Sequence, residues 1–105
     1  YSMTFNVTKN KETGKLVLNG MLNQRSQDVL TANNWNVCQY AALVHILAQV
    51  NDMEVGEFVH VIADAHIYDR HVPLVEELIS REQHPAPKLW INYVTGEQIK
   101  IPVAV

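Results

Sequence analysis

The 105-residue chain has one cysteine, no excess of positive charge and no long apolar run. A single cysteine, Cys38, excludes an internal disulfide and is typical of a reducing compartment. The net charge of -3 excludes the broad basic surface that holds nucleic acid. No segment approaches the roughly 20 apolar residues of a membrane span, and the first residues, YSMTFNV, lack the pattern of a signal peptide. We therefore expect a cytoplasmic protein with neither a membrane nor a DNA partner.

Charged side chains are also scarce, at 18% of residues, whereas hydrophobic residues make up 48%. Globular domains usually carry about a quarter charged residues, so part of this surface is expected to lie against other protein. The length suits one small domain, residues 1–105. The sequence does not begin with methionine, and we expect it to be an excerpt.

Alternating polar and apolar residues predict an antiparallel pair of strands at the start of the chain. Tyr1–Val7 and Leu16–Leu22 both alternate, and the polar run Thr8–Lys15 between them, with Gly14 near its end, predicts a hairpin loop. The first strand is expected to be half-buried, with its odd-numbered residues on the apolar side.

A long apolar helix is predicted in the middle of the chain, over Val37–Val50. Its apolar residues wrap most of the helix surface, which predicts burial between two other layers. Asn34 is expected to cap it. The preceding segment, Gln24–Asn36, is polar and is predicted to be irregular.

The remainder predicts further strand and helix pieces. Gly56 is expected to mark a turn before a strand, and a helix with apolar spacing from Val72 to Ile79 is expected to end before Pro85 and Pro87. The other expected elements are a strand over Phe58–Tyr68, a strand over Leu89–Tyr93, a turn at Thr95–Gly96 and an extended piece over Gln98–Val105. The fold class is therefore α+β, with mixed or antiparallel sheet pieces around a long buried central helix.

Four polar residues follow the second predicted strand, and two of them, Arg25 and Ser26, could hold a phosphate. Arg25 supplies a planar cationic donor and Ser26 a hydroxyl, and Gln24 and Asp28 flank them. On residue types alone, the alternative is a solvated loop with an ordinary surface arginine.

Histidines and an aspartate crowd into the predicted strand of residues 58–68 and its end. His60, Asp64, His66 and His71 suggest a metal, but in a strand His60 and His66 would lie roughly 20 Å apart at about 3.3 Å per residue. One ion cannot bridge that distance, so a metal site is weakly supported. His66 and Tyr68 point the same way and suit sugar hydroxyls, the alternative being two amphipathic side chains at a sheet rim.

Asn36 and Cys38 lie at the start of the predicted central helix. The amide of Asn36 offers a donor beside an acceptor, which complements the edge of uracil; the alternative is a second helix cap. Cys38 has no histidine nearby in sequence to act as its base, so we expect a packing role rather than a nucleophile.

Taken together, these segments resemble the thymidylate synthase family over nearly the whole chain. Five ordered segments carry the resemblance: QRSQDVL, WNVCQYAALVHILAQV, EVGEFVHVIADAHIYDRH, REQHPAPKLWIN and IPVAV. The family converts dUMP and 5,10-methylenetetrahydrofolate to dTMP and dihydrofolate without a metal, as an obligate homodimer. The resemblance implies the C-terminal portion of that fold, and a dimer would account for the low surface charge.

The resemblance also implies a role for each matching residue. Gln24, Arg25 and Ser26 would bind dUMP at its phosphate end and Asn36 would read the uracil edge. The dUMP set is completed by Asp28, His66 and Tyr68, the last two on the ribose 3′-hydroxyl.

The folate co-substrate would meet a different set of residues. Asp28 would contact it through its carboxylate, and Ala104 and Val105 would belong to a tail that closes over both ligands. The family's nucleophilic cysteine would fall just ahead of Tyr1. We therefore expect no catalytic residue within the chain and no activity from residues 1–105 alone.

The chain departs from the family pattern in three places. Ala32 and the pair Ile62–Ala63 stand where glycines are usual, and a segment normally found after Asn92 is missing. Two further functions stay open: a non-catalytic module for dUMP binding or dimerisation, and a pyrimidine-nucleotide hydroxymethylase. Asn36 favours uracil over cytosine, because the cytosine-specific relatives carry aspartate at this position.

Overall fold

A computed structural model of the chain describes residues 1–91. It divides into two compact units, Tyr1–Val72 and Pro73–Val105, which are described separately. Whether residues 1–105 form a single domain stays a prediction. The elements in chain order are β1 (Ser2–Lys9), β2 (Leu16–Asp28), α1 (Asn33–Val50), β3 (Glu54–His66), a 3-10 turn η1 (Asp69–His71) and α2 (Val72–Ser80).

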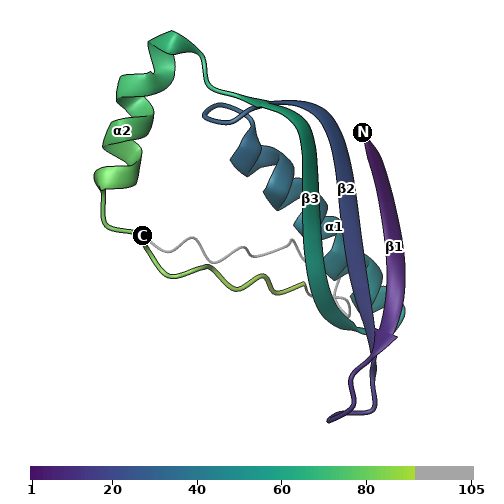
Figure 1. The fold of residues 1–105 in the computed structure, drawn as a ribbon. Coiled ribbons are helices and arrows are strands. Elements are labelled where there is room, and N and C mark those ends of the chain that lie inside the picture. The colour runs from purple at the N-terminus through teal and green to yellow at the C-terminus, as the bar shows by residue number, and fades with distance from the viewer. Residues whose placement is uncertain (92–105) are drawn as a thin grey trace. The chain divides into compact units, whose positions relative to one another are not determined.

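The first unit contains a three-stranded mixed sheet in the order β1-β2-β3 (Figure 1). β1 is antiparallel to β2, and β2 is parallel to β3. Two neighbouring parallel strands need a crossover connection, and α1 provides it between β2 and β3. The α+β class is thus confirmed, and the carboxyl ends of β2 and β3 meet at the same edge of the sheet.

The predicted hairpin is also confirmed. Lys9 pairs with Leu16, so the loop comprises residues 10–15. The side-chain oxygen of Asn10 accepts hydrogen bonds from the backbone N–H of Glu12 and of Thr13. Gly14 has a φ of 73°, which glycine adopts at no steric cost, and it completes the turn.

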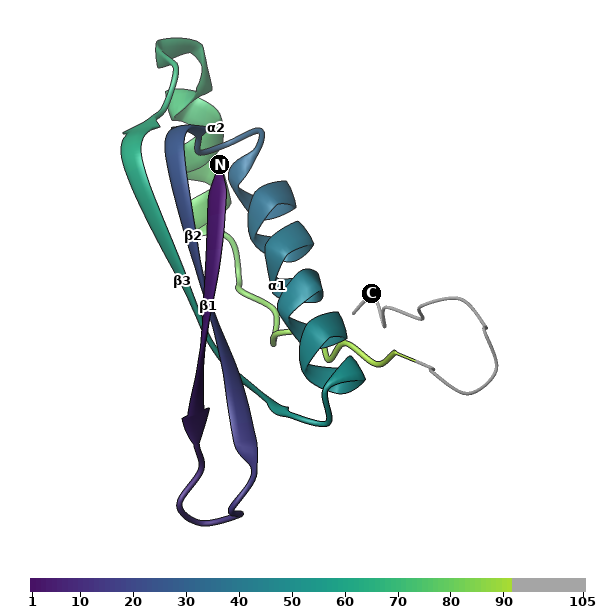
Figure 2. The same cartoon turned by 90° about the vertical axis from the view of Figure 1, so that its right-hand side faces the viewer.

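Helix α1 packs on one face of the sheet (Figure 2). Leu18, Val44 and Ala48 form the core between the two, with Met3 and Phe58 packed against it. Gly20 makes this packing close. A Cβ atom there would lie 2.6 Å from Met3 Cε and 2.9 Å from Val44 Cγ2, so any larger residue would push the helix away.

The predicted helix was wrong in its start and its cap, and its predicted burial is not seen in the described first unit. It begins at Asn33, and its N-cap is Ala32, without a side-chain capping hydrogen bond. Asn34 therefore lies inside the first turn. Within residues 1–91 the helix buries only Val44 and Ala48, and Trp35 is 78% exposed. A single sheet covers one side of the helix in the described first unit, so the predicted burial between two layers is not seen there.

The strands also extend further than the side chains predicted. β2 continues through Asp28, so Gln24–Asp28 is strand rather than irregular chain. β3 begins at Glu54, so Gly56 lies inside the strand and not in a turn. Backbone pairing with the neighbouring strand decides both cases, because ladder hydrogen bonds do not depend on side-chain polarity. β1 extends to Lys9, and Met3 is its only residue that is not exposed, so its predicted half-burial was wrong.

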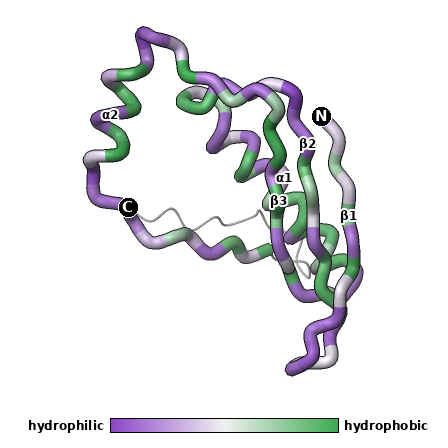
Figure 3. Tube along the Cα trace, in the orientation of Figure 1, coloured by the Kyte–Doolittle hydropathy of each residue, from purple (hydrophilic) through white to green (hydrophobic). Residues whose placement is uncertain are grey.

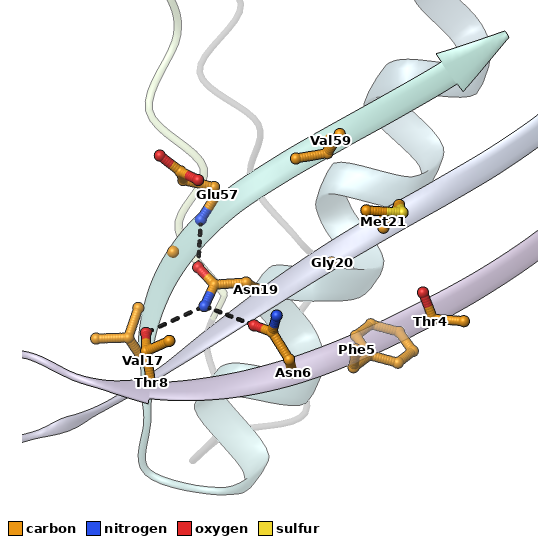
Figure 4. Close-up of a pocket in the computed structure, with 11 residues that line it drawn as sticks. Thr4, Phe5, Asn6, Thr8, Val17, Asn19, Gly20, Met21, Glu57 and Val59 are labelled. Carbon is orange, nitrogen blue, oxygen red and sulfur yellow. Dashed lines mark hydrogen bonds between the residues drawn. The ribbon is translucent and has the colours of Figure 1, made fainter.

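A register shift between Leu18 and Gly20 of β2 interrupts the pairing with β3 at Gly56 and Glu57. Asn19 fills the interruption (Figure 4). Its side-chain oxygen accepts a hydrogen bond from the backbone N–H of Glu57 at 2.9 Å. Its amide nitrogen donates to the side chains of Asn6 and Thr8 on β1.

The second unit contains α2, apart from its first residue. The helix ends at Ser80, ahead of Pro85, and the Ser80 hydroxyl donates to the carbonyl oxygen of Glu77. Hydrophobic and hydrophilic residues alternate along its turns (Figure 3). In residues 1–91 no helix is both long and apolar enough to cross a membrane.

Two predictions about the C-terminal segments have different outcomes. Of the strand predicted over Leu89–Tyr93, the described residues show only an isolated β-bridge at Trp90, and Leu89 and Ile91 belong to no strand. The predicted turn at Thr95–Gly96 and the extended piece over Gln98–Val105 lie outside the described residues.

Candidate functional site

The polar residues singled out in the sequence gather at the carboxyl ends of the parallel strands β2 and β3. Ser26 pairs with Asp64, and Asp28 pairs with His66. In α/β units this edge is where ligands bind, because the loops and helix starts that follow the strands converge there. The site therefore has the position expected of a binding site.

Gln24 is the centre of one hydrogen-bonded group at this edge. It is only 5% exposed. Its amide nitrogen donates to the backbone carbonyl of Ser26 at 2.8 Å and to the side-chain oxygen of Asn36 at 3.3 Å. Its oxygen lies 2.9 Å from Nε2 of His60. The structure thus brings together two predicted ligand-binding residues, Gln24 and Asn36, with a histidine for which the sequence suggested only a metal.

Asn36 lies in the first turn of α1, and its backbone N–H donates to the carbonyl oxygen of Ala32. It is half-buried. Its side chain points to Gln24 rather than to an N–H at the helix start, so the alternative that it caps the helix is wrong.

Asp28 forms a second group with the residues after β2 and with the end of β3. The backbone N–H of Thr31 donates to its carboxylate, and the backbone N–H of Val29 donates to the carbonyl of His66. The hydrogen bond from the Thr31 side chain lowers the pKa of Asp28 most, and the charges of His71 and His66 lower it further. Asp28 is therefore held as an anion that accepts hydrogen bonds.

His66 and Tyr68 contact each other edge to face, with ring centroids 5.4 Å apart. Tyr68 also contacts the ring of His71 at 5.6 Å, and the guanidinium of Arg70 lies over it at 5.4 Å. The predicted pair is therefore a real contact, and the Tyr68 ring is also held by Arg70, which the sequence did not single out, and by His71, for which it suggested only a metal. Their signal in the sequence was only proximity, in the run HIYDRH.

Arg25 and Ser26 are both exposed, and the alternation of burial along β2 breaks at them. Arg25 borders a cavity of about 360 Å³ together with Asn23, Val61 and Ala63. The structure places the two predicted phosphate ligands next to each other along the strand, with Arg25 available to an anion. Gln27, which the sequence did not single out, is almost fully buried directly after them.

Cys38 is exposed on α1, so the expectation of a buried packing cysteine was wrong. It lines a shallow apolar hollow with Asn34 and Trp35. Its exposure follows from the position of α1, which turns only one side to the sheet.

Among residues 1–91, no three His, Cys, Asp or Glu side chains lie close enough together to hold a metal ion. Of the departures from the family pattern, Ala32 is the N-cap of α1, and Ile62 pairs with Gln24. The predicted folate ligands Ala104 and Val105 lie outside the described residues.

Comparison with known proteins gives one consistent result. The family model of thymidylate synthase matches residues 1–102. The thymidylate synthase of Leuconostoc mesenteroides subsp. mesenteroides is 44% identical over 79 residues, which cover 75% of this chain. The thermostable thymidylate synthase A from Bacillus subtilis matches with a TM-score of 0.75 and 37% identity over 92% of this chain. The chain spans 24% of the first relative and 33% of the second.

Proposed function

The chain belongs to the thymidylate synthase family, and we propose that the protein containing it methylates dUMP to dTMP with 5,10-methylenetetrahydrofolate. The observation that carries this proposal is the hydrogen-bonded group of Gln24 and Asn36 at the carboxyl ends of β2 and β3. It presents the amide of Asn36 at the edge of the sheet where a ligand would lie.

We assign the recognition of dUMP to three places. Asn36 reads the uracil edge, with Gln24 beside it. Arg25 and Ser26, two consecutive exposed residues of β2, bind the phosphate, for which a guanidinium and a hydroxyl are suited donors. The remaining dUMP ligands are His66 and Tyr68, which donate to or accept from the ribose 3′-hydroxyl, and Asp28.

The folate co-substrate is assigned to Asp28 and to the tail residues Ala104 and Val105. The lowered pKa of Asp28 supports its role as an acceptor, since an ionised carboxylate accepts hydrogen bonds from a neutral heterocycle. No metal takes part in the proposed reaction.

The nucleophile of the proposed reaction is a cysteine thiolate outside residues 1–105. Cys38 is exposed on α1 beside Asn34 and Trp35 and is not assigned this role. We therefore propose that residues 1–105 alone form no dTMP.

We further propose that the protein is a cytoplasmic homodimer that binds neither DNA nor membranes. The sheet face opposite α1 supports the dimer. Met21, Val59 and Val61 lie there on neighbouring strands and are 41%, 41% and 46% exposed, and Figure 4 shows the first two side by side. A second copy would bury this apolar surface against its own equivalent.

The test is turnover by the full-length protein with dUMP and 5,10-methylenetetrahydrofolate. We expect dTMP and dihydrofolate in equal amounts. Arg25→Ala should weaken dUMP binding by at least tenfold, whereas Arg81→Ala, which removes an exposed arginine paired with Glu77, should not. Binding of dUMP without product would indicate a non-catalytic module, and a hydroxymethylated nucleotide would indicate a hydroxymethylase. Either result would overturn the proposal.

A further inference from the structure

The backbone carbonyl of Ser26 fixes the orientation of the Gln24 amide. A carbonyl oxygen only accepts hydrogen bonds, so the Gln24 atom 2.8 Å from it must be the nitrogen. The opposite orientation would bring two oxygens together in a site where Gln24 is almost fully buried. The oxygen of Gln24 therefore faces His60.

This orientation determines the state of both partners of Gln24. Nε2 of His60 lies 2.9 Å from the Gln24 oxygen, so it must carry a proton and donate a hydrogen bond to that oxygen. The second N–H of the Gln24 amide must donate to an acceptor, so the Asn36 atom 3.3 Å away is its oxygen. A rotation of the Asn36 amide by 180° would set two donors against each other.

We propose that His60 is a positioning residue for base selection, which acts through Gln24 to hold the Asn36 amide in the orientation that accepts uracil and rejects cytosine. This inference rests on the proposed function, because it takes Asn36 as the residue that reads the base. It adds a role for a histidine that does not itself contact the nucleotide in this proposal.

The chemistry of the two bases explains the selection. The side-chain oxygen of Asn36 accepts a hydrogen bond from Gln24, which leaves one lone pair on that oxygen and both N–H groups of the Asn36 amide free to bind a base. Uracil offers an N3–H to the oxygen and an O4 acceptor to the nitrogen. Cytosine offers a lone pair at N3 and an amino group at C4, so both pairings fail unless the amide rotates. An Asn36 amide fixed in this orientation therefore weakens the binding of cytosine but not that of uracil.

Loss of the hydrogen bond that His60 donates should leave the orientation of the Asn36 amide no longer fixed. The Gln24 oxygen would be buried without a partner, a state that proteins avoid, and the side chain would move toward water and away from Asn36. The Asn36 amide could then rotate to suit either base. The affinity for dCMP should therefore rise relative to the affinity for dUMP.

Two substitutions at His60 form a matched pair. In His60→Gln the side-chain nitrogen reaches the position of Nε2 and can still donate to Gln24, whereas in His60→Asn the shorter amide reaches only the position of Nδ1. The affinities of dUMP and dCMP for the full-length protein are measured by calorimetry for each form. We expect the dUMP-to-dCMP affinity ratio to fall at least fivefold in His60→Asn and to stay within about twofold of the original in His60→Gln.

The possible outcomes separate this inference from the proposed function. A protein that binds no dUMP overturns the proposed function and this inference with it. Binding of dUMP with an unchanged ratio in His60→Asn overturns this inference alone, as does an equal loss in both variants.

A measurement on the unmodified protein avoids any dependence on how the variants fold. The ring nitrogen chemical shifts of His60 report its tautomer directly. We expect a protonated Nε2 in the ligand-free protein at neutral pH. A ring protonated only at Nδ1 would overturn the inference, because the Gln24 oxygen would then face an acceptor.

Discussion

The side-chain oxygen of Asn19 accepts a hydrogen bond from the backbone N–H of Glu57, 2.9 Å away, where the pairing of β2 with β3 shifts by one residue. The extra residue of a bulge leaves a backbone group without its ladder partner. Asn19 supplies that partner, and its amide nitrogen binds the neighbouring strand through Asn6 and Thr8. One side chain thus joins all three strands.

Asn19→Ala should destabilise the protein by about 1–3 kcal/mol, since it removes three hydrogen bonds and leaves the Glu57 N–H unpaired. Urea denaturation of the full-length protein measures this loss. The matched control is Asn23→Ala, which removes an exposed asparagine from the same face of the same strand and should cost less than about 0.5 kcal/mol. Equal losses in the two variants would show that Asn19 does not join the strands.

Thr31→Ala should raise the pKa of Asp28 toward its ordinary value, because it removes the side-chain hydrogen bond that lowers that pKa most. Thr31→Ser keeps the hydroxyl and should leave the pKa unchanged. The carboxyl carbon chemical shift of Asp28 as a function of pH measures both. A pKa that does not move in Thr31→Ala would mean that the backbone N–H of Thr31, together with the charges of His71 and His66, is the main cause.

The same pKa predicts how stability depends on pH. The folded-state pKa of Asp28 lies below the ordinary value, so its carboxylate contributes stability above that ordinary value, about 3.9. This contribution is lost as the pH falls through the folded-state pKa. Asp28→Asn should therefore be less stable than the original at neutral pH, and the difference should shrink in acid.

Tyr68→Phe should weaken dUMP binding about two- to twelvefold, the equivalent of one hydrogen bond of about 0.5–1.5 kcal/mol. The ring contacts with His66 and His71 are kept in this variant. Calorimetry with 2′,3′-dideoxyuridine monophosphate provides the control, because that ligand lacks the 3′-hydroxyl and should lose nothing further on the substitution. An equal loss for both ligands would contradict the ribose assignment.

Val59→Glu should shift the protein toward a monomer, since it places a charge in the apolar face assigned to the dimer. Sedimentation velocity of the full-length protein at several concentrations measures this. Lys11→Gln, in the exposed hairpin loop, changes the net charge by the same amount and should leave the dimer intact. A Val59→Glu protein that still sediments as a dimer would locate the interface elsewhere.

The sequence predicted local structure well where side-chain period and backbone pairing agree. The alternation in residues 1–7 and 16–22 identified the hairpin, because both strands have an apolar side toward α1. It failed at Gln24–Asp28, where the backbone pairs with β3 although the side chains are polar. It failed at Gly56 for a similar reason, since a bulge filled by a distant asparagine is not visible in local sequence.

The sequence singled out the residues of the candidate site but not the contacts between them. The motif resemblance identified Gln24, Asn36, His66 and Tyr68 individually. The hydrogen bond between His60 and Gln24 joins residues 36 positions apart, and only the parallel register of β2 and β3 brings them together. Spacing along a single strand therefore predicted a weak metal site for His60 instead of its contact with Gln24.

The assignment of Asn36 to the base of dUMP is central to the proposed function, and one calorimetric titration tests it directly. In this titration dUMP is added to the full-length protein and to its Asn36→Ala variant. We predict saturable 1:1 binding per chain that weakens at least tenfold in the variant, because both pairings with the uracil edge are lost. Absence of dUMP binding, or equal affinity in the two proteins, would contradict the account.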